Sequence, residues 1–175
     1  MNTDNWFDVC FGFHEGFGKV KLNRKRNYVG NDGKLLSPTW FDYCYDFREG
    51  FACVELDGKS NYIDKEGKLL SGTWFDYCGC FFDGFAGVKE NRKWNYIGKD
   101  GKLLSSTWFD YCHDFHNGFA AVKLNGKENY IGEDGKLLSS TWFDDCYKFG
   151  DGFGCVVLNG KWSYIDKEGG LREHR

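Results

Sequence analysis

Short stretches of alternating apolar and polar residues recur along the chain, and Gly-containing turns separate them. In Phe51–Leu56 every second side chain is apolar, a period of two that is typical of a half-buried β-strand. Asp57-Gly58 follows and favours a two-residue hairpin turn, because Asp, Asn and Gly tolerate positive φ. The pattern therefore predicts a hairpin that returns through Lys59–Ile63.

Two further strands are predicted before the next hairpin. Asp64–Gly67 indicates a type I turn that closes on a left-handed Gly. Lys68–Ser71 is predicted as a third strand, and the aromatic stretch Thr73–Cys78 as a fourth. No segment shows helical periodicity of useful length, so the sequence predicts an all-β protein.

The whole pattern repeats every 34 residues, and Trp-Phe-Asp begins each copy. The copies span residues 6–39, 40–73, 74–107, 108–141 and 142–175, so we interpret 1–175 as a single repeat domain. Columns that are identical in all five copies include, in the second copy, Trp40, Phe41, Asp42, Cys44, Phe47, Gly50, Phe51, Val54, Lys59, Tyr62 and Gly67. Strict repetition indicates that each copy packs in the same way.

Strand parity limits the architecture. Three strands per copy would reverse the chain direction in alternate copies, whereas four strands restore it, and repeated four-stranded antiparallel units are the blades of a β-propeller. The chain opens on a fourth strand near residues 6–10 and ends on a third strand near 170–173. Pairing these strands would complete a fifth blade and remove two exposed edges. We expect a closed five-bladed β-propeller, with an open β-solenoid as the alternative.

The end of the chain resembles a known repeat family. Gly152–Gly169 contains Lys-Trp-Ser-Tyr-Ile-Asp-Lys-Glu-Gly and is similar to the bacterial WG (KWG) β-repeat, whose frame extends over all five copies. The name-giving pair departs from the family pattern, because Trp occurs only at Trp94 and Trp162, and Asn or Ser replaces the following Gly. The resemblance implies a β-rich binding or scaffolding array and supplies no catalytic motif.

Composition excludes several classes of function. A net charge of −3 gives no electrostatic footprint for nucleic acid or for an anionic membrane surface. No apolar run is long enough to span a bilayer, and Met1–Asn5 lacks the basic and apolar regions of a signal peptide. We therefore expect a cytoplasmic protein with reduced thiols and no membrane partner.

Neither the cysteines nor the histidines have the spacing of a chemical site. Five cysteines occupy one repeated column, and Cys78-x-Cys80 lacks the partner pair that a zinc site requires, so we interpret the thiols as small buried apolar groups. Asp114 and His116 are close enough for an acid–base pair, but the chain offers near-copies rather than one asymmetric constellation. We expect no metal, no cofactor and no catalytic residue.

The repeated Trp-Phe-Asp sites have two interpretations. As equivalent pockets, Trp6, Trp40, Trp74, Trp108 and Trp142 would offer flat faces to carbohydrate, with the Asp accepting hydroxyl hydrogen bonds. Alternatively, Trp and Phe pack between neighbouring copies while Asp bonds backbone donors at a turn.

The columns that vary between copies are the other candidates for recognition. They fall at the junctions between copies, where loops gather and binding residues concentrate. A variable column in the second strand of the hairpin adds two Trp residues. The predicted binding residues are Tyr45, Arg48, Phe82, Trp94, His113, His116, Tyr147 and Trp162.

Together these features predict a non-catalytic binding or scaffolding module for a protein or peptide partner. A multivalent lectin-like carbohydrate binder that uses the repeated aromatic pockets is the alternative.

Overall fold

The computed structural model describes residues 6–172 of the chain. Its contacts divide the chain into two compact units, one ending at Cys80 and the other beginning at Phe81. Strands β1 to β6 lie in the first unit: β1 (Val9–His14), β2 (Phe17–Leu22), β3 (Lys25–Gly30), β4 (Tyr43–Cys44), β5 (Phe51–Leu56) and β6 (Lys59–Asp64). The boundary falls within β7 (Tyr77–Phe82). The second unit continues with β8 (Phe85–Glu90), β9 (Lys93–Gly98), β10 (Tyr111–Cys112), β11 (Phe119–Leu124), β12 (Lys127–Gly132), β13 (Asp145–Cys146), β14 (Phe153–Leu158), β15 (Lys161–Asp166) and β16 (Leu171–Arg172).

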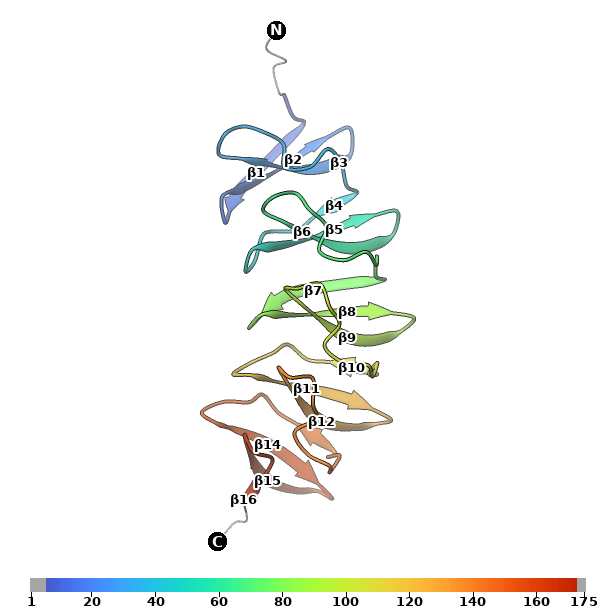
Figure 1. Ribbon diagram of the computed structural model, residues 1–175, viewed down its shortest axis with the longest axis vertical. Helices are drawn as coiled ribbons and strands as arrows, with labels where there is room; N and C mark the ends of the chain where they lie inside the picture. Colours follow the sequence, from blue (N-terminus) through green and yellow to red (C-terminus); the bar gives the residue numbers. More distant parts are fainter. Residues whose placement is uncertain (1–5, 173–175) are drawn as a thin grey trace. The chain divides into compact units, whose positions relative to one another are not determined.

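Five antiparallel hairpins form the framework, and Figure 1 shows them as pairs of long arrows. In β5–β6 the register runs from Phe51 opposite Asp64 to Leu56 opposite Lys59. The turn between them has φ of 51° at Asp57 and 77° at Gly58, as a type I′ turn requires. The predicted hairpins are confirmed in all five repeats.

The predicted third strand is wrong in its extent. In the second repeat it is reduced to one bridge between Ile63 and Leu69. The buried Asn61 side chain explains the loss, because its amide Nδ2 donates to the carbonyl of Ser71 at 2.8 Å. The Ser71 hydroxyl in turn accepts the N–H of Thr73 at 3.0 Å. Side chains thus satisfy backbone groups that a strand ladder would otherwise pair.

The predicted fourth strand is divided between two hairpins. Phe41 exchanges two backbone hydrogen bonds of 2.8 Å with Arg26 of the preceding hairpin. Two residues later, Tyr43 and Cys44 pair with Glu55 and Val54 of the following hairpin. The Trp-Phe-Asp segments of the second, fourth and fifth repeats therefore each join one repeat to the next.

The hydrophobic core lies between successive hairpins within each unit. In the first unit, Tyr28 of β3 packs with Phe41, Cys44 and Phe47 of the joining segment and with Val54 and Ile63 of the next hairpin, all at most 5% exposed. The second unit holds two clusters of the same composition, centred on Phe115 and Phe149. This interleaved core confirms the expected all-β array of five antiparallel repeats. Closure of the array into a ring stays a prediction.

Nothing in residues 6–172 forms a helix that could cross a membrane.

An invariant glycine lies where two repeats approach most closely. Gly135 has φ of 77°, and a Cβ built on it would lie 2.4 Å from the carbonyl oxygen of Leu104 in the preceding repeat. In the same way, a Cβ built on Gly67 would be too close to the carbonyl oxygen of Leu36, and one built on Gly169 too close to that of Leu138. Gly126, in the hairpin turn, also has φ of 77° but has nothing within 4 Å of its Cβ position.

This contrast gives a matched pair of substitutions. Gly126→Ala should cost about 1 kcal/mol, because only the left-handed backbone is penalised. Gly135→Ala should cost at least about 2 kcal/mol more, since the repeats must also move apart. Urea unfolding of both variants measures the difference in unfolding free energy. Equal losses would show that the close approach between the repeats is not rigid.

The cysteines separate into buried and exposed groups. Cys44 is fully buried and Cys112 is 8% exposed, and burial raises the pKa of each thiol to about 12. Cys10 and Cys80 are exposed. The interpretation of the repeated column as buried thiols therefore holds for Cys44, Cys78, Cys112 and Cys146, whereas Cys10 of the same column is exposed because no described residue packs over it.

A thiol-specific reagent should therefore modify Cys10 and Cys80 quickly in the native protein at mildly alkaline pH. The buried cysteines should react only after unfolding, because both access and thiolate formation are suppressed. Mass spectrometry of labelled peptides, with and without denaturant, measures this. Fast native labelling of Cys44 or Cys112 would contradict the buried core.

Candidate binding site at the junctions between repeats

A buried tyrosine in each of the first four hairpins fixes the junction with the next repeat. The hydroxyl of Tyr28 donates to the backbone carbonyl of Tyr45 at 2.5 Å, and that of Tyr96 donates to the carbonyl of His113 at 2.5 Å. Tyr130 bonds the carbonyl of Tyr147 in the same manner. Burial raises the pKa of these phenols, so they remain protonated donors. The tyrosines hold the backbone of a variable column in place.

The side chains of that column face outward. Tyr45 is 39% exposed and Tyr147 is 45% exposed, although their carbonyls are held by buried hydroxyls. The first and fourth junctions thus present a variable side chain on a fixed backbone.

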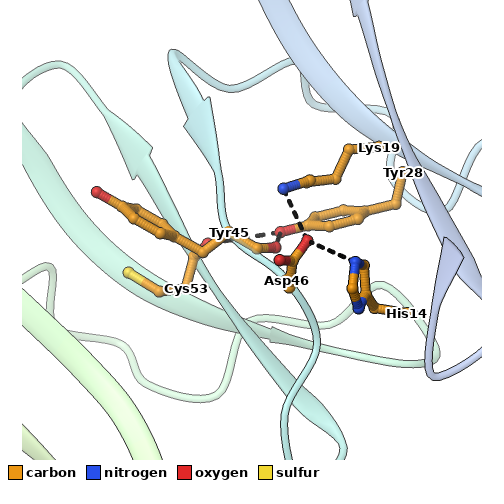
Figure 2. A network of polar contacts seen from close by, with 6 residues as sticks. All are labelled: His14, Lys19, Tyr28, Tyr45, Asp46 and Cys53. Carbon is orange, nitrogen blue, oxygen red and sulfur yellow. Dashed lines mark hydrogen bonds and ion pairs between the residues drawn. The ribbon is translucent and has the colours of Figure 1, made fainter. Parts of the chain in front are cut away.

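In the first junction an ion pair lies beside Tyr45. Lys19 of β2 lies 2.7 Å from Asp46, and His14 of β1 approaches the same carboxylate at 3.8 Å. Figure 2 shows both side chains pointing at Asp46, with the Tyr28 hydroxyl directed at the Tyr45 carbonyl. The chain fills this junction with its own polar groups.

The equivalent junction in the second unit is open. Ala121 replaces Lys19, and Lys148 replaces Asp46, so the ion pair cannot form. A pocket of about 420 Å³ lies there, lined by β11, β12 and β13 and by the loops that follow β10 and β13. Its lining residues are His113, Asp114, His116, Phe119, Ala121, Glu128, Tyr130, Asp145, Cys146, Tyr147, Lys148 and Phe149.

The base of the pocket is rigid and aromatic. Phe149 lies 4.5 Å from Phe119 and meets Tyr130 edge to face at 5.2 Å, measured between ring centroids. Glu128 is 6% exposed, and its Oε2 accepts the backbone N–H of Cys146 at 2.8 Å. These contacts join β12 to β13 beneath the opening, so the pocket is preformed.

The lining of the pocket carries mixed charge. Asp114 and Asp145 line it together with Lys148 and two histidines. Glu128, in the base, lies 3.8 Å from Lys123. Burial raises the pKa of the Cys146 thiol, with the Glu128 and Asp145 charges adding to the effect, so the thiol is not a nucleophile at neutral pH. The pocket offers hydrogen-bonding, charged and aromatic groups, which suits recognition of a peptide segment.

The predicted binding residues are only partly brought together. His113, His116 and Tyr147 line the pocket, and Tyr45 holds the corresponding position in the first junction. Trp162 stacks on Tyr147 with ring centroids 5.0 Å apart, which places it beside the rim. Trp94 contacts Tyr111, Phe82 contacts His116 at 6.3 Å, and Arg48 pairs through its backbone with Phe51.

The repeated Trp-Phe-Asp positions are largely engaged within the chain. One oxygen of Asp110 pairs with Lys93, and the other accepts the N–H of Asn125 at 2.7 Å. The Lys93 hydrogen bond and that backbone bond hold the pKa of Asp110 below its usual value. The Phe members are buried except Phe7, which is half-buried. Trp40, Trp74, Trp108 and Trp142 are half-buried, and Trp6 is 82% exposed. Carbohydrate binding at these positions stays a prediction, with fewer carboxylate oxygens available than the sequence suggested.

Sequence reasoning missed the residue that opens the pocket. Ala121 belongs to a column that reads Lys19, Cys53, Gly87, Ala121 and Cys155, and its variation was the available signal. Its importance depends on Lys148, which only the fold places across the junction. Within the described part of the chain, no three His, Cys, Asp or Glu residues are grouped as a metal site would require.

Comparison with known proteins identifies the repeat. A family described as "WG containing repeat" matches residues 28–59, 62–94, 96–127 and 130–162. The matched segments begin at Tyr28, Tyr62, Tyr96 and Tyr130, the residues that hold the junctions. No curated protein gives a significant sequence match.

Some solved structures show a distant resemblance. Hsv2 of Kluyveromyces lactis is 11% identical, with 95% of this chain and 64% of that chain covered at a TM-score of 0.44. A form of Hsv2 with loop 6CD replaced by a Gly-Ser linker gives 9% identity, 92% and 63% coverage, and a TM-score of 0.47. A protein of unknown function from Bacteroides caccae gives 12% identity, 98% and 81% coverage, and a TM-score of 0.34. The chain spans less than two thirds of both Hsv2 chains, and similarity at this level carries no information on binding.

The comparison of the two junctions predicts how to close the pocket. Ala121→Lys alone places a second amino group beside Lys148, whereas Ala121→Lys combined with Lys148→Asp recreates the pair that Lys19 and Asp46 form. The two substitutions should show a favourable coupling of about 0.5–1 kcal/mol in unfolding free energy. A double-mutant cycle by urea unfolding measures it. Additive effects would show that the two positions do not meet as their counterparts do.

Proposed function

Because the chain belongs to the WG containing repeat family, we propose that it is a non-catalytic module that binds a peptide segment of a partner protein at the junctions between its repeats. The pocket between β11–β12 and β13 is the principal site. The residues that are identical in all repeats hold neighbouring repeats together. The variable side chains at the junctions, whose backbone is fixed by the buried tyrosines, are available to bind a partner.

The observation that carries this proposal is the contrast between equivalent junctions. The positions that form an ion pair in the first junction help to line a pocket of about 420 Å³ in the fourth. Pockets of this size admit a small ligand or one to two side chains of a peptide. Residues from variable columns of two successive repeats line the pocket. Substitutions in these columns can therefore change its specificity while the invariant residues that hold the repeats together stay the same.

The chemistry of the lining favours a basic side chain on the bound segment. In the first junction the chain's own cations lie over aromatic rings, with Lys19 Nζ 5.5 Å from the Phe11 centroid and the Arg26 guanidinium 3.8 Å from that of Tyr43. In the fourth junction, His113 and Asp145 stand at the positions of Phe11 and Tyr43. An incoming Lys or Arg would meet carboxylates and the Tyr147 ring there, which together attract a cation.

Selection of peptides from a random phage-displayed library tests the proposal. Selected peptides should be enriched in Lys or Arg and should bind the wild-type protein measurably in a calorimeter. Tyr147→Ala and the combined Ala121→Lys, Lys148→Asp variant should each weaken binding about tenfold or more, because one removes the aromatic wall and the other fills the space. Tyr45→Ala changes the same column in the first junction and should leave binding unchanged.

Two results would contradict the proposal. Peptides whose affinity is equally insensitive to Tyr147→Ala and to the filled pocket would place recognition elsewhere on the protein. A glycan array that gives reproducible binding, lost on Trp108→Phe but retained in the filled-pocket variant, would favour the carbohydrate alternative.

A further inference from the structure

The last repeat exposes the residue that elsewhere holds a junction. Tyr164 occupies the column of Tyr28, Tyr62, Tyr96 and Tyr130 and is 50% exposed, whereas those four are each 1% exposed. Each of the four donates its hydroxyl to a carbonyl of the following repeat. Tyr164 has no such acceptor within residues 6–172. The outer face of the fifth repeat, defined by Lys161, Trp162 and Tyr164, therefore carries the residues of one side of a junction without a following repeat to pair with them.

The first repeat exposes the other half. Phe13 is 54% exposed, while the residues of its column, Phe47, Phe81, Phe115 and Phe149, are at most 5% exposed. Trp6 is 82% exposed, whereas its counterparts are half-buried. The outer face of the first repeat, defined by Trp6, Asp8 and Phe13, lacks the hairpin that covers this side in later repeats.

The charges on the two faces are complementary. In the internal junctions a lysine pairs with an aspartate of the next repeat, as in Lys25–Asp42, Lys59–Asp76, Lys93–Asp110 and Lys127–Asp144. The other oxygen of Asp42 accepts the N–H of Asp57 at 2.8 Å. Asp8 accepts the matching N–H, from Asn23 at 2.9 Å, but no lysine pairs with it in the described chain. Lys161 belongs to the same column as these lysines and has no aspartate partner within residues 6–172.

We propose that these two faces bind each other between copies of the chain, so that the fifth repeat of one copy docks on the first repeat of the next. Lys161 pairs with Asp8 of the second copy, and the Tyr164 hydroxyl donates to the backbone carbonyl of Phe11. The contact repeats an interface that the chain already forms between its own repeats, with the same residue types at the same positions.

A second copy is the proposed occupant because the two faces carry complementary residue types and each is exposed within its own unit. Exposed aromatic residues contribute most of the binding free energy, and the charge pair sets the register. Since the two faces differ, the contact is heterologous and leaves a free face at each end of a dimer. Association should therefore continue beyond dimers as concentration rises.

Charge reversal across the contact tests this. Lys161→Glu and Asp8→Lys should each weaken self-association about five- to tenfold, because an attractive pair becomes repulsive. In either variant alone, two like charges face each other across the contact. In a mixture, the new glutamate at position 161 of one variant faces the new lysine at position 8 of the other, and the unchanged Lys161 faces the unchanged Asp8. Both contacts are then attractive. The mixture should associate as the wild type does. Sedimentation velocity over a wide concentration range measures the masses, and Lys34→Glu, in an exposed turn, is the matched control.

Each outcome decides the proposal. Concentration-dependent growth of the wild type, loss in both single variants and recovery in the mixture support it. A wild type that is monomeric at every concentration overturns it. Self-association that both reversals leave unchanged also overturns it, because another surface is then responsible. The wild type could also be monomeric, with a melting temperature that Lys161→Glu lowers and that Lys161→Glu combined with Asp8→Lys restores. In that case the two faces bind within one chain, and the proposal is overturned.

Discussion

The hydrogen bond from a buried tyrosine hydroxyl to a carbonyl 17 residues later is the contact on which the junction depends. It extends from the core of one repeat to the surface segment of the next. The tyrosine ring is packed in the core, so its hydroxyl has a fixed position, and an unmet donor there would be costly. The segment that receives it, with Tyr45 or His113 at its centre, is thereby ordered although it belongs to no long strand.

Sharing of the Trp-Phe-Asp segment makes the repeats interdependent. Phe41 completes the hydrogen bonding of one hairpin, and its near neighbour Cys44 pairs with the next. A single repeat would leave half of these groups unpaired and half of its core exposed, so stability comes from contacts between neighbours. This accounts for the invariant columns, because Phe41, Asp42, Lys59, Tyr62 and Gly67 each contact an adjacent repeat.

Much of the fold could be predicted from the sequence because its signals are local. The Asp57-Gly58 turn and the alternation in Phe51–Leu56 define a hairpin by themselves, and exact spacing extends it to every repeat. The third strand could not be predicted correctly, because the Asn61 side chain takes over backbone bonds that the pattern assigned to a ladder. The variable columns indicated where recognition lies. The pocket itself depends on Ala121 facing Lys148, a relation that appears only when two repeats are joined.

The contrast between junctions explains how such an array acquires specificity at little cost. Replacing the Lys19–Asp46 pair by Ala121 and Lys148 removes an ion pair at a partly exposed site, and such pairs contribute at most about 1 kcal/mol. The buried framework beneath, with Tyr130 on Phe149, is the same as that of Tyr28 on Phe47. Substitutions that open or close a pocket therefore leave the interleaved core intact. Each junction can change its surface chemistry while the hydroxyl–carbonyl bond continues to hold its backbone.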